Sequence, residues 1–441
     1  MKKRILLKNI NLFDVKDDIL RKNADILIEN DSIKEVGKLN YVGEETLEQI
    51  DCSGKFALPG LFECHAHLTV LTNQDDQTKK EILKEVGIEK ASLKEELEKQ
   101  VLKAFVVKGI TQVRDVGGPV KTLKDLKDKI SNGEYAGPHI FYAGPMLEKS
   151  PLTGQENNKR WPEFTVPIDS VQDAKNTIEQ ISSEGASLVK TFGKFDEDVL
   201  KCLLDEAKEH NLPVTHDSGP TFFHSVPVDR GIDLGIRCFE HGKSPWYAVL
   251  KDDLKKEHDR LIDADPEAKE AFRNKVFSLG TQSISLAKLR KLIDKMTNHD
   301  IYFCPTLHIF KHYAENPEVY REDEPDKFRK IFEILYEISR FITREMIKQG
   351  IKILVGQDGW NPRFTFNEMQ LLKEVGLSEP EIIKGATIYP AEWLGISEQI
   401  GSVSPNNKAN ILILNKNPLE DIQNIKTTYA VLSNGKFVFR E

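Results

Sequence analysis

Cysteine is scarce in this sequence. Five cysteines are scattered through 441 residues, odd in number and without a CxxC pair, so the pattern predicts no disulfide framework and favours a reduced, cytoplasmic setting. Long apolar runs are lacking as well. None reaches the length of a transmembrane helix, and the run Ile5-Leu6-Leu7 after the basic start is too short for a signal peptide. We therefore expect a cytoplasmic protein with no membrane partner.

An excess of basic residues is also missing. Charged residues make up 30% of the chain, but the formal net charge is −8, which argues against nucleic acid or an anionic membrane as the partner. The stretches 78–103 and 250–275 are rich in Lys and Glu, and we interpret them as solvated faces of helices. With 39% hydrophobic residues, a chain of this length suits one large domain with a smaller one attached.

Short β-type runs occupy both ends of the chain. The turn Ser433-Asn434-Gly435 separates the last two of them, and Asn-Gly between two such runs predicts a hairpin. The runs are 5–10, 24–29, 32–36, 409–414, 428–432 and 436–439. We predict that residues 1–56 and 399–441 together form one small β-sandwich domain.

The middle of the chain, residues 57–398, alternates apolar runs with amphipathic stretches. Apolar residues recur three and four positions apart from Phe328 to Met346, which predicts a helix that ends at Gly350. Eight apolar runs are expected to be strands: 56–63, 110–116, 140–144, 187–192, 213–216, 238–241, 301–305 and 352–356. This alternation predicts an α/β fold, a (β/α)₈ TIM barrel, with insertions at 70–100 and 243–300. A doubly wound sheet is the alternative, but no glycine-rich nucleotide loop follows the first strand.

The first of these strands runs into His65-Ala66-His67. Alternate residues of a strand point to the same side, so the two imidazoles project together. Two neutral imidazoles side by side are suitable ligands for a divalent metal such as zinc. On spacing alone, histidines that satisfy local hydrogen bonds are an equally good explanation.

Polar residues recur where other predicted strands end. In a barrel of this kind the active site lies at the C-terminal ends of the strands. A lysine inside an apolar run is costly unless it is paired or modified. The residues are Arg114-Asp115, Lys190, His216, Glu240-His241-Gly242 and Gly356-Gln357-Asp358. Each alone has an ordinary local explanation, but their joint placement at one end of one barrel favours an active site.

Longer segments across most of the chain carry a family resemblance. They include Leu58-Pro59-Gly60-Leu61-Phe62-Glu63-Cys64-His65-Ala66-His67-Leu68, residues 109–118, Phe239-Glu240-His241-Gly242, Pro305-Thr306-Leu307, Ala386-Thr387 with Pro390-Ala391, and residues 415–422. In these segments the chain resembles the amidohydrolase superfamily of binuclear metal hydrolases on (β/α)₈ barrels. Within it, the chain is most similar to the branch of imidazolonepropionase-related proteins and Xaa-Pro dipeptidases.

The resemblance implies a set of ligands for two divalent ions, which we expect to be zinc. These are His65, His67 and Asp358 for one metal, His216 and His241 for the other, and Lys190 as a carbamate that bridges the two. A desolvated lysine has a lowered pKa, so its neutral amine can add CO₂. Four neutral histidines and one carboxylate would leave two divalent cations with excess positive charge, and the carbamate would supply a further negative charge.

The activity that follows is hydrolysis of amide (C–N) bonds in a small-molecule substrate, a dipeptide or an N-acyl amino acid, by a hydroxide that bridges the metals. Asp358 would take the proton and pass it to the leaving nitrogen. His308, Asp217 and Arg114 are candidate substrate-binding residues, although Arg114 in an ion pair that braces the barrel mouth is an equally good interpretation. The sequence leaves open the substrate side chain, the native metal and assembly into a homo-oligomer.

Two alternatives stay open. A cyclic amidohydrolase or a deaminase of a small heterocycle, similar to imidazolonepropionase, would use one metal, whereas the full ligand set with Lys190 favours two metals and exocyclic amides. A metal-free scaffold protein is the non-enzyme alternative. Such proteins lose several ligands, and this chain retains all six candidate positions.

Overall fold

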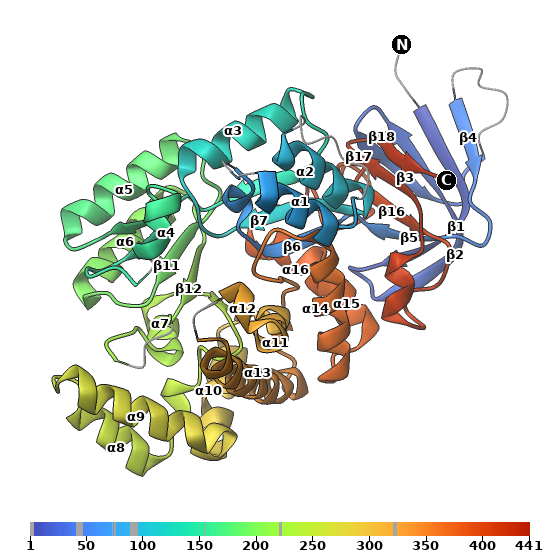
Figure 1. The fold of residues 1–441 in the computed structure, drawn as a ribbon. Helices are drawn as coiled ribbons and strands as arrows, with labels where there is room; N and C mark the ends of the chain where they lie inside the picture. The colour runs from blue at the N-terminus through green and yellow to red at the C-terminus, as the bar shows by residue number, and fades with distance from the viewer. Residues whose placement is uncertain are drawn as a thin grey trace.

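The computed structural model describes residues 4–40, 47–72, 74, 76–88, 96–153, 155–219, 223–320 and 324–441. Strands from both ends of the chain lie in one eight-stranded sheet, the terminal sheet, with the order β18-β17-β16-β5-β1-β2-β3 and with β4 paired to β1. Figure 1 shows this sheet at one end of the molecule, where the first strands in blue meet the last strands in red. Its strands are β1 (Arg4–Asp14), β2 (Ile19–Glu29), β3 (Ser32–Gly37), β4 (Leu47–Asp51), β5 (Phe56–Pro59), β16 (Ile411–Leu414), β17 (Thr428–Ser433) and β18 (Lys436–Arg440). The division into two domains at residues 56 and 399 stays a prediction.

Strand β16 connects the terminal sheet to the rest of the protein. Ile411 and Ile413 pack into the core of the terminal sheet, whereas Leu412 and Leu414 pack into the large core of the α/β part. Because side chains alternate between the two faces of a strand, this one strand contributes to both cores.

The predicted hairpin at the C-terminal end is confirmed. Strands β17 and β18 pair in antiparallel fashion, and Asn434 and Gly435 have φ values of 47° and 70°. Two consecutive positive φ angles are what a tight hairpin turn of type I′ requires. A Cβ atom at Gly435 would lie 1.9 Å from the carbonyl oxygen of Asn30, so this position has room only for glycine.

The middle of the chain is an α/β fold with parallel strands. The strands form a three-stranded sheet, β6-β7-β8, and a seven-stranded sheet, β10-β9-β11-β12-β13-β14-β15. Where the sequence predicts one barrel sheet of eight strands, the described residues of this region form ten strands in two sheets. Backbone hydrogen bonds connect the sheets on both sides, from Ser187 to Tyr142 at 2.8 Å and from Cys64 to Val355 at 2.9 Å. The strands are β6 (Leu61–Ala66), β7 (Ile110–Asp115), β8 (His139–Tyr142), β9 (Met146–Glu148), β10 (Thr165–Pro167), β11 (Val189–Phe192), β12 (Val214–Asp217), β13 (Cys238–Glu240), β14 (Tyr302–Cys304) and β15 (Lys352–Ile353).

The prediction of one strand over residues 56–63 was wrong. The run is two strands: β5 pairs with β16 in the terminal sheet, and β6 pairs with β7 in the parallel sheet. The chain divides at Gly60, where a Cβ atom would lie 2.0 Å from Oγ1 of Thr111. Glycine therefore permits the close approach at which the chain leaves one sheet and enters the other.

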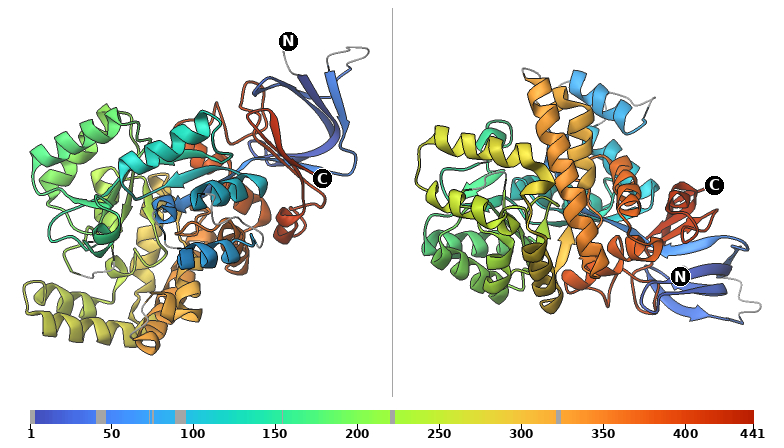
Figure 2. Two further views of the ribbon diagram at one scale, coloured as in Figure 1. Left: turned by 45° about the horizontal axis from the view of Figure 1, so that its top comes forward. Right: turned by 90° about the horizontal axis from the view of Figure 1, so that it is seen from below.

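Helices follow most of the parallel strands. The predicted helix over 328–346 is confirmed as part of α13, which buries Phe332, Ile338, Ile342 and Met346 on one face. Figure 2 shows α8 and α9, from the predicted insertion 243–300, far from the terminal sheet. The helices are α1 (Asp76–Glu85), α2 (Leu97–Val107), α3 (Val120–Ser131), α4 (Gln155–Arg160), α5 (Val171–Ser183), α6 (Glu197–Glu209), α7 (Val228–Leu234), α8 (Asp252–Arg260), α9 (Pro266–Leu279), α10 (Leu286–Asn298), α11 (Leu307–Glu315), α12 (Pro317–Tyr320), α13 (Pro325–Lys348), α14 (Pro362–Glu374), α15 (Glu379–Gly385) and α16 (Ile388–Trp393), with short 3₁₀ turns at Leu68–Leu71, Tyr247–Val249, Gly280–Ser283 and Ile422–Lys426.

Two further features bear on the sequence predictions. All five cysteines lie in the described part of the chain and carry free thiols. Among the described residues, no helix combines the length and the apolar character needed to cross a membrane.

Candidate active site

Three residues of the predicted ligand set meet where the first and last parallel strands end. His65 lies in β6 and His67 directly after it, and Asp358 follows β15. Backbone hydrogen bonds hold the segments together, from the Asp358 N–H to the His65 carbonyl at 2.9 Å and from the His67 N–H to the Gly359 carbonyl at 3.0 Å. As a result, Oδ1 of Asp358 lies 3.4 Å from Nε2 of His65 and 3.3 Å from Nε2 of His67.

The second nitrogen of each of these histidines has a partner on the side away from Asp358. Nδ1 of His65 lies 2.8 Å from Oε2 of Glu240, and Nδ1 of His67 lies 2.9 Å from the carbonyl oxygen of Gly117. Because both partners are acceptors, each Nδ1 donates, and in the neutral form of either ring the lone pair is on Nε2. Metal-binding histidines in proteins show this same arrangement.

His241 is the third histidine near Asp358, and we call His65, His67, His241 and Asp358 the histidine group. Its Nδ1 lies 3.9 Å from Oδ2 of Asp358 and accepts a hydrogen bond from the hydroxyl of Thr306 at 2.7 Å. Its Nε2 lies 3.1 Å from Oδ2 of Asp217. Ligand atoms of His65, His241 and Asp358 lie within 4.8 Å of one another, which is close enough for one ion to reach all three.

The local environment shifts His65 and Asp358 in the direction that metal binding needs, and His67 in the opposite direction. Burial, more than any neighbouring charge, lowers the pKa of His65 to about 3, so its imidazole is neutral. Burial also opposes a charge on His67, but its hydrogen bond to the carboxylate of Asp358, together with the charges of Asp358 and Asp115, raises the pKa of His67. For Asp358, burial acts upward, but the neighbouring histidines hold its pKa below the ordinary value. The carboxylate of Asp358 is therefore ionised and the imidazole of His65 is neutral.

Lys190 lies in β11 with only 1% of its surface exposed. Its Nζ atom has no hydrogen-bond partner among the residues that the structure describes. Its charge acts on the buried carboxylates of Glu240 and Asp217, so the amine lies within the same polar region as the histidines. A buried amine without a partner is costly in an ordinary protein interior, and this cost fits the predicted modification of Lys190.

The structure does not bring His216 into this group. Both ring nitrogens already have partners, Nδ1 with Oγ1 of Thr191 at 2.9 Å and Nε2 with the carbonyl oxygen of Val226 at 3.1 Å. Burial lowers the pKa of His216 to about 4, so the ring is neutral. His216 lies at the end of β12, as predicted, but neither nitrogen is directed at Asp358.

Arg114 and Asp217, two of the predicted substrate-binding residues, have partners within the protein. Arg114 is fully buried, and its guanidinium donates to Oε1 of Glu240 at 2.6 Å. Asp217 is 3% exposed and lies between His241 and Lys243, whose Nζ is 3.6 Å from Oδ1. Although burial acts upward, Lys243 and then His241 hold the pKa of Asp217 well below its ordinary value. Both residues thus contact the surroundings of the histidine group, and their binding of substrate stays a prediction.

His308, the third such residue, lies at the start of α11. Its backbone N–H donates to Oε2 of Glu368 at 2.6 Å, and its ring lies 4.3 Å from that of Phe364. Nε2 of His308 has no hydrogen-bond partner within the described part of the chain. Its contact with substrate also stays a prediction.

Aromatic side chains form two walls beside the histidine group. Phe164 lies 5.5 Å from the ring of His67, and Phe310 lies 5.9 Å from the ring of His241. Burial, and then the charge of Asp358, raise the pKa of Tyr313, so its hydroxyl stays protonated. Aromatic rings therefore lie on two sides of the histidine group.

Glu240 is named in the sequence analysis at a strand end without a role, and Tyr313 is not named there. Glu240 is part of the motif Phe239-Glu240-His241-Gly242, and a carboxylate at the end of a predicted strand, beside a candidate ligand, was a usable signal. Tyr313 lies on a helical face that gave no such signal.

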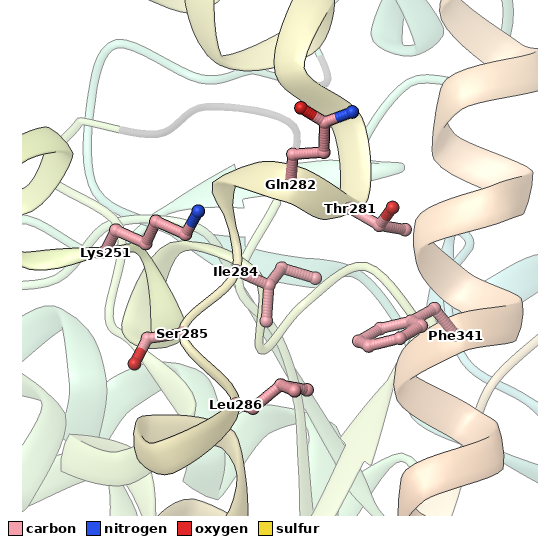
Figure 3. A pocket seen from close by; sticks show the side chains of 7 residues that line it. All are labelled: Lys251, Thr281, Gln282, Ile284, Ser285, Leu286 and Phe341. Carbon is pink, nitrogen blue, oxygen red and sulfur yellow. The ribbon is translucent and has the colours of Figure 1, made fainter.

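A surface groove elsewhere does not belong to this site. It lies between α13 and the segment that follows α9, and it is lined by residues such as Lys251, Gln282, Leu286 and Phe341, which Figure 3 shows from close by. None of its lining residues is a member of the predicted ligand set.

Solved structures similar to this one cover nearly the whole chain. A prolidase in complex with N-methylphosphonate-L-proline superposes with a TM-score of 0.74 at 20% identity, covering 99% of this chain and 100% of the other. A Xaa-Pro dipeptidase with bound methionine gives 0.72 at 20% identity, with the same coverage. Ochratoxinase from A. niger gives 0.71 at 17% identity and covers 100% of this chain and 96% of the other. At these identities the likeness concerns the fold.

Sequence comparisons give shorter matches and a family. A 5-methylthioadenosine/S-adenosylhomocysteine deaminase of Thermodesulfovibrio yellowstonii is 29% identical over 19% of this chain and 22% of its own length. A dihydroorotase of Caldicellulosiruptor saccharolyticus is 41% identical over 14% of this chain and 15% of its own. The chain thus spans less than a quarter of the curated relatives it matches. The profile of the Amidohydrolase family matches residues 56–216 and 335–438, more than half of the chain. The chain belongs to the amidohydrolase family.

Proposed function

We propose that this protein is a hydrolase of C–N bonds that holds two divalent metal ions, expected to be zinc, in a closed (β/α)₈ barrel. The observation that carries the proposal is the gathering of three histidines around one carboxylate. His65 and His67 direct Nε2 toward Asp358 and bind an acceptor of the protein through Nδ1. Nδ1 of His241 lies 3.9 Å from Asp358 and is also 2.7 Å from the hydroxyl of Thr306. Two imidazoles held in this way beside a buried carboxylate, with a third close by, are what a metal centre requires.

The residues fit the two ions unequally. His65, His67 and Asp358 are assigned to the first ion, and Oδ1 of Asp358 lies 3.4 Å from Nε2 of His65 and 3.3 Å from Nε2 of His67. His241, His216 and a carboxylated Lys190 are assigned to the second. His241 and the unpartnered amine of Lys190 support this assignment, while His216 hydrogen-bonds the carbonyl of Val226. When bound, the ions act as Lewis acids that polarise the scissile carbonyl and lower the pKa of a water molecule.

Formation of the carbamate follows simple stoichiometry. The neutral amine of Lys190 forms an N–C bond to CO₂ and releases one proton, and the product carries one negative charge. The carbamate shares its one negative charge between two oxygens, which would be ligands for the two ions, and it replaces an amine that has no hydrogen-bond partner among the described residues.

The side chains around the ions perform the proton transfers. Asp358, held ionised by its neighbours, takes a proton from the attacking water and delivers it to the leaving nitrogen. Burial and the charge of Asp358 raise the pKa of Tyr313, so its hydroxyl is not a base for these transfers. Phe164 and Phe310 exclude water from the two flanks of the histidine group.

Dipeptides and N-acyl amino acids are the proposed substrates. The aromatic walls favour an apolar group beside the scissile bond, and the similar structures include a prolidase and a Xaa-Pro dipeptidase. A cyclic amidohydrolase or a deaminase is the second candidate, because the two short sequence matches are to a deaminase and a dihydroorotase.

Metal analysis and a substrate panel test the proposal. Protein prepared without chelators should contain about two divalent ions per chain and should cleave Xaa-Pro and other dipeptides or N-acyl amino acids in preference to dihydroorotate and S-adenosylhomocysteine. Asp358→Asn keeps an oxygen near the metal but cannot accept a proton at neutral pH, so turnover should fall about a hundredfold or more while metal is retained. Asp294→Asn, on the exposed face of α10, is the matched control. Protein without stoichiometric metal, or an Asp358→Asn variant with near-normal turnover, would refute the assignment.

A further inference from the structure

We propose that Glu240, braced by Arg114, is a positioning residue that fixes the tautomer and orientation of His65. This inference rests on the proposed metal-dependent function, because it explains how one ligand is held ready for an ion. The Glu240–Arg114 pair touches neither the walls of the site nor Asp358 in any contact that the structure describes. Among the predicted ligands, the one that hydrogen-bonds Glu240 is His65.

The two carboxylate oxygens of Glu240 have different hydrogen-bond partners. Oε2 faces Nδ1 of His65 at 2.8 Å. Oε1 accepts from the guanidinium of Arg114 at 2.6 Å and from the hydroxyl of Thr215. An ionised carboxylate is only an acceptor, so Nδ1 of His65 must carry the proton, and the lone pair stays on Nε2.

Arg114 fixes this carboxylate relative to the strand that carries His65. Its Nε donates to the carbonyl oxygen of Cys64, the residue before His65, while its Nη2 binds Glu240. The guanidinium also lies 4.9 Å from the ring centre of Trp393. Arg114 and Glu240 are both fully buried. One guanidinium thus holds the backbone of β6 and the end of β13 at a set distance, and the imidazole is held between them.

A competing interpretation makes Glu240 a metal ligand. Ligand atoms of His65, Glu240 and Cys304 lie within 4.8 Å of one another. However, the guanidinium of Arg114 is already 2.6 Å from Oε1, and a divalent ion beside it would meet like charge in a buried environment. Glu240 therefore acts on a metal through His65 rather than directly.

The test separates positioning from simple charge balance. Glu240→Gln retains the shape of the side chain but removes the charge and leaves Arg114 buried without its counter-ion, so this single variant is liable to unfold. The double variant Arg114→Met/Glu240→Leu removes both charges together with the acceptor for Nδ1 of His65, and it should recover the fold. Asp294→Asn, on the exposed face of α10, is the matched control.

The measurement is Co²⁺ affinity by competition with a chelator, together with the visible absorption spectrum of the bound Co²⁺. We expect the double variant to fold, to bind Co²⁺ about 10–100-fold more weakly than the unsubstituted protein, and to give an altered spectrum, whereas Asp294→Asn keeps both the affinity and the spectrum. A double variant with unchanged affinity and spectrum would show that Glu240 only neutralises Arg114 and would overturn the inference while the proposed function stands. Unsubstituted protein that binds no Co²⁺ would overturn both.

Discussion

Lys190 offers a prediction in which stability and function move in opposite directions. Its amine is buried, and no hydrogen-bond partner for it occurs among the described residues. Lys190→Met keeps the length and approximate volume of the side chain but removes the polar group. We therefore expect the metal-free variant to be more stable than the unsubstituted protein, although the substitution removes a residue assigned to the site.

The expected magnitude follows from the environment of the amine. A buried polar group without a partner costs about 1–3 kcal/mol. Glu240 and Asp217 lie near enough for their charges to act on Lys190, so the cost is that of unmade hydrogen bonds and not that of an isolated buried charge. A bound metal ion, by contrast, stabilises the folded protein. An ion at a free concentration of 100 times its Kd adds roughly 2.7 kcal/mol to folding stability, and the variant should lose this increment for one of its two ions.

Denaturant unfolding with and without added zinc measures both quantities. The variant should gain about 1–3 kcal/mol in the presence of a chelator, lose about one ion per chain by elemental analysis, and lose most of its activity. Lys201→Met, at an exposed position of α6, should change stability by less than about 0.5 kcal/mol. Short carboxylic acids should partly restore activity by occupying the space of the carbamate. A Lys190→Met variant with full activity and two ions would refute the carbamate, and a less stable metal-free variant would refute the argument from the unpaired amine.

Three other predictions address the rest of the site and the fold. Glu368→Gln leaves one of two backbone N–H groups at the first turn of α11 without an acceptor, so it should destabilise the protein by about 1–3 kcal/mol in denaturant unfolding, with the exposed Glu374→Gln as its control. Gly60→Ala places a methyl group 2.0 Å from Oγ1 of Thr111; it should cost about 1–3 kcal/mol, and Thr111→Ala should recover part of the loss. His308→Ala should raise KM for the preferred substrate while the metal content stays constant, and an unchanged KM would exclude a contact between His308 and the substrate.

The strands and the placement of polar residues could be predicted because they depend on local patterns. Apolar runs bounded by glycine, proline and polar residues correspond to the parallel strands, and His65, Lys190 and His216 lie in them as expected. The division of the first run at Gly60 could not be predicted in the same way. Its cause is a steric contact with Thr111, a residue distant in the sequence, although the dipeptide Pro59-Gly60 is itself a turn signal.

The orientations within the site could not be read from the sequence for a related reason. Whether a histidine offers a nitrogen to a metal depends on what holds its other nitrogen, and those partners come from other strands. Glu240 holds His65, and Asp217 holds His241, whereas Thr191 and Val226 occupy both nitrogens of His216. Strand ends therefore predict which residues approach the site, but the hydrogen bonds between strands decide which of them face it.

Three residues at these strand ends have a strained backbone conformation, which lowers the stability of the fold but orients the site. His241, Thr306 and Asp358 have φ values of 67°, 49° and 59°, a left-handed conformation that costs about 1–3 kcal/mol for residues other than glycine. All three belong to the histidine group or contact it. Hydrogen bonds oppose the strain, since the N–H of His241 donates to the carbonyl of Cys304 at 2.7 Å and that of Asp358 to the carbonyl of His65 at 2.9 Å. Each bond ties a strained residue to a neighbouring strand, so the parallel strands themselves hold the strained residues in place around Asp358.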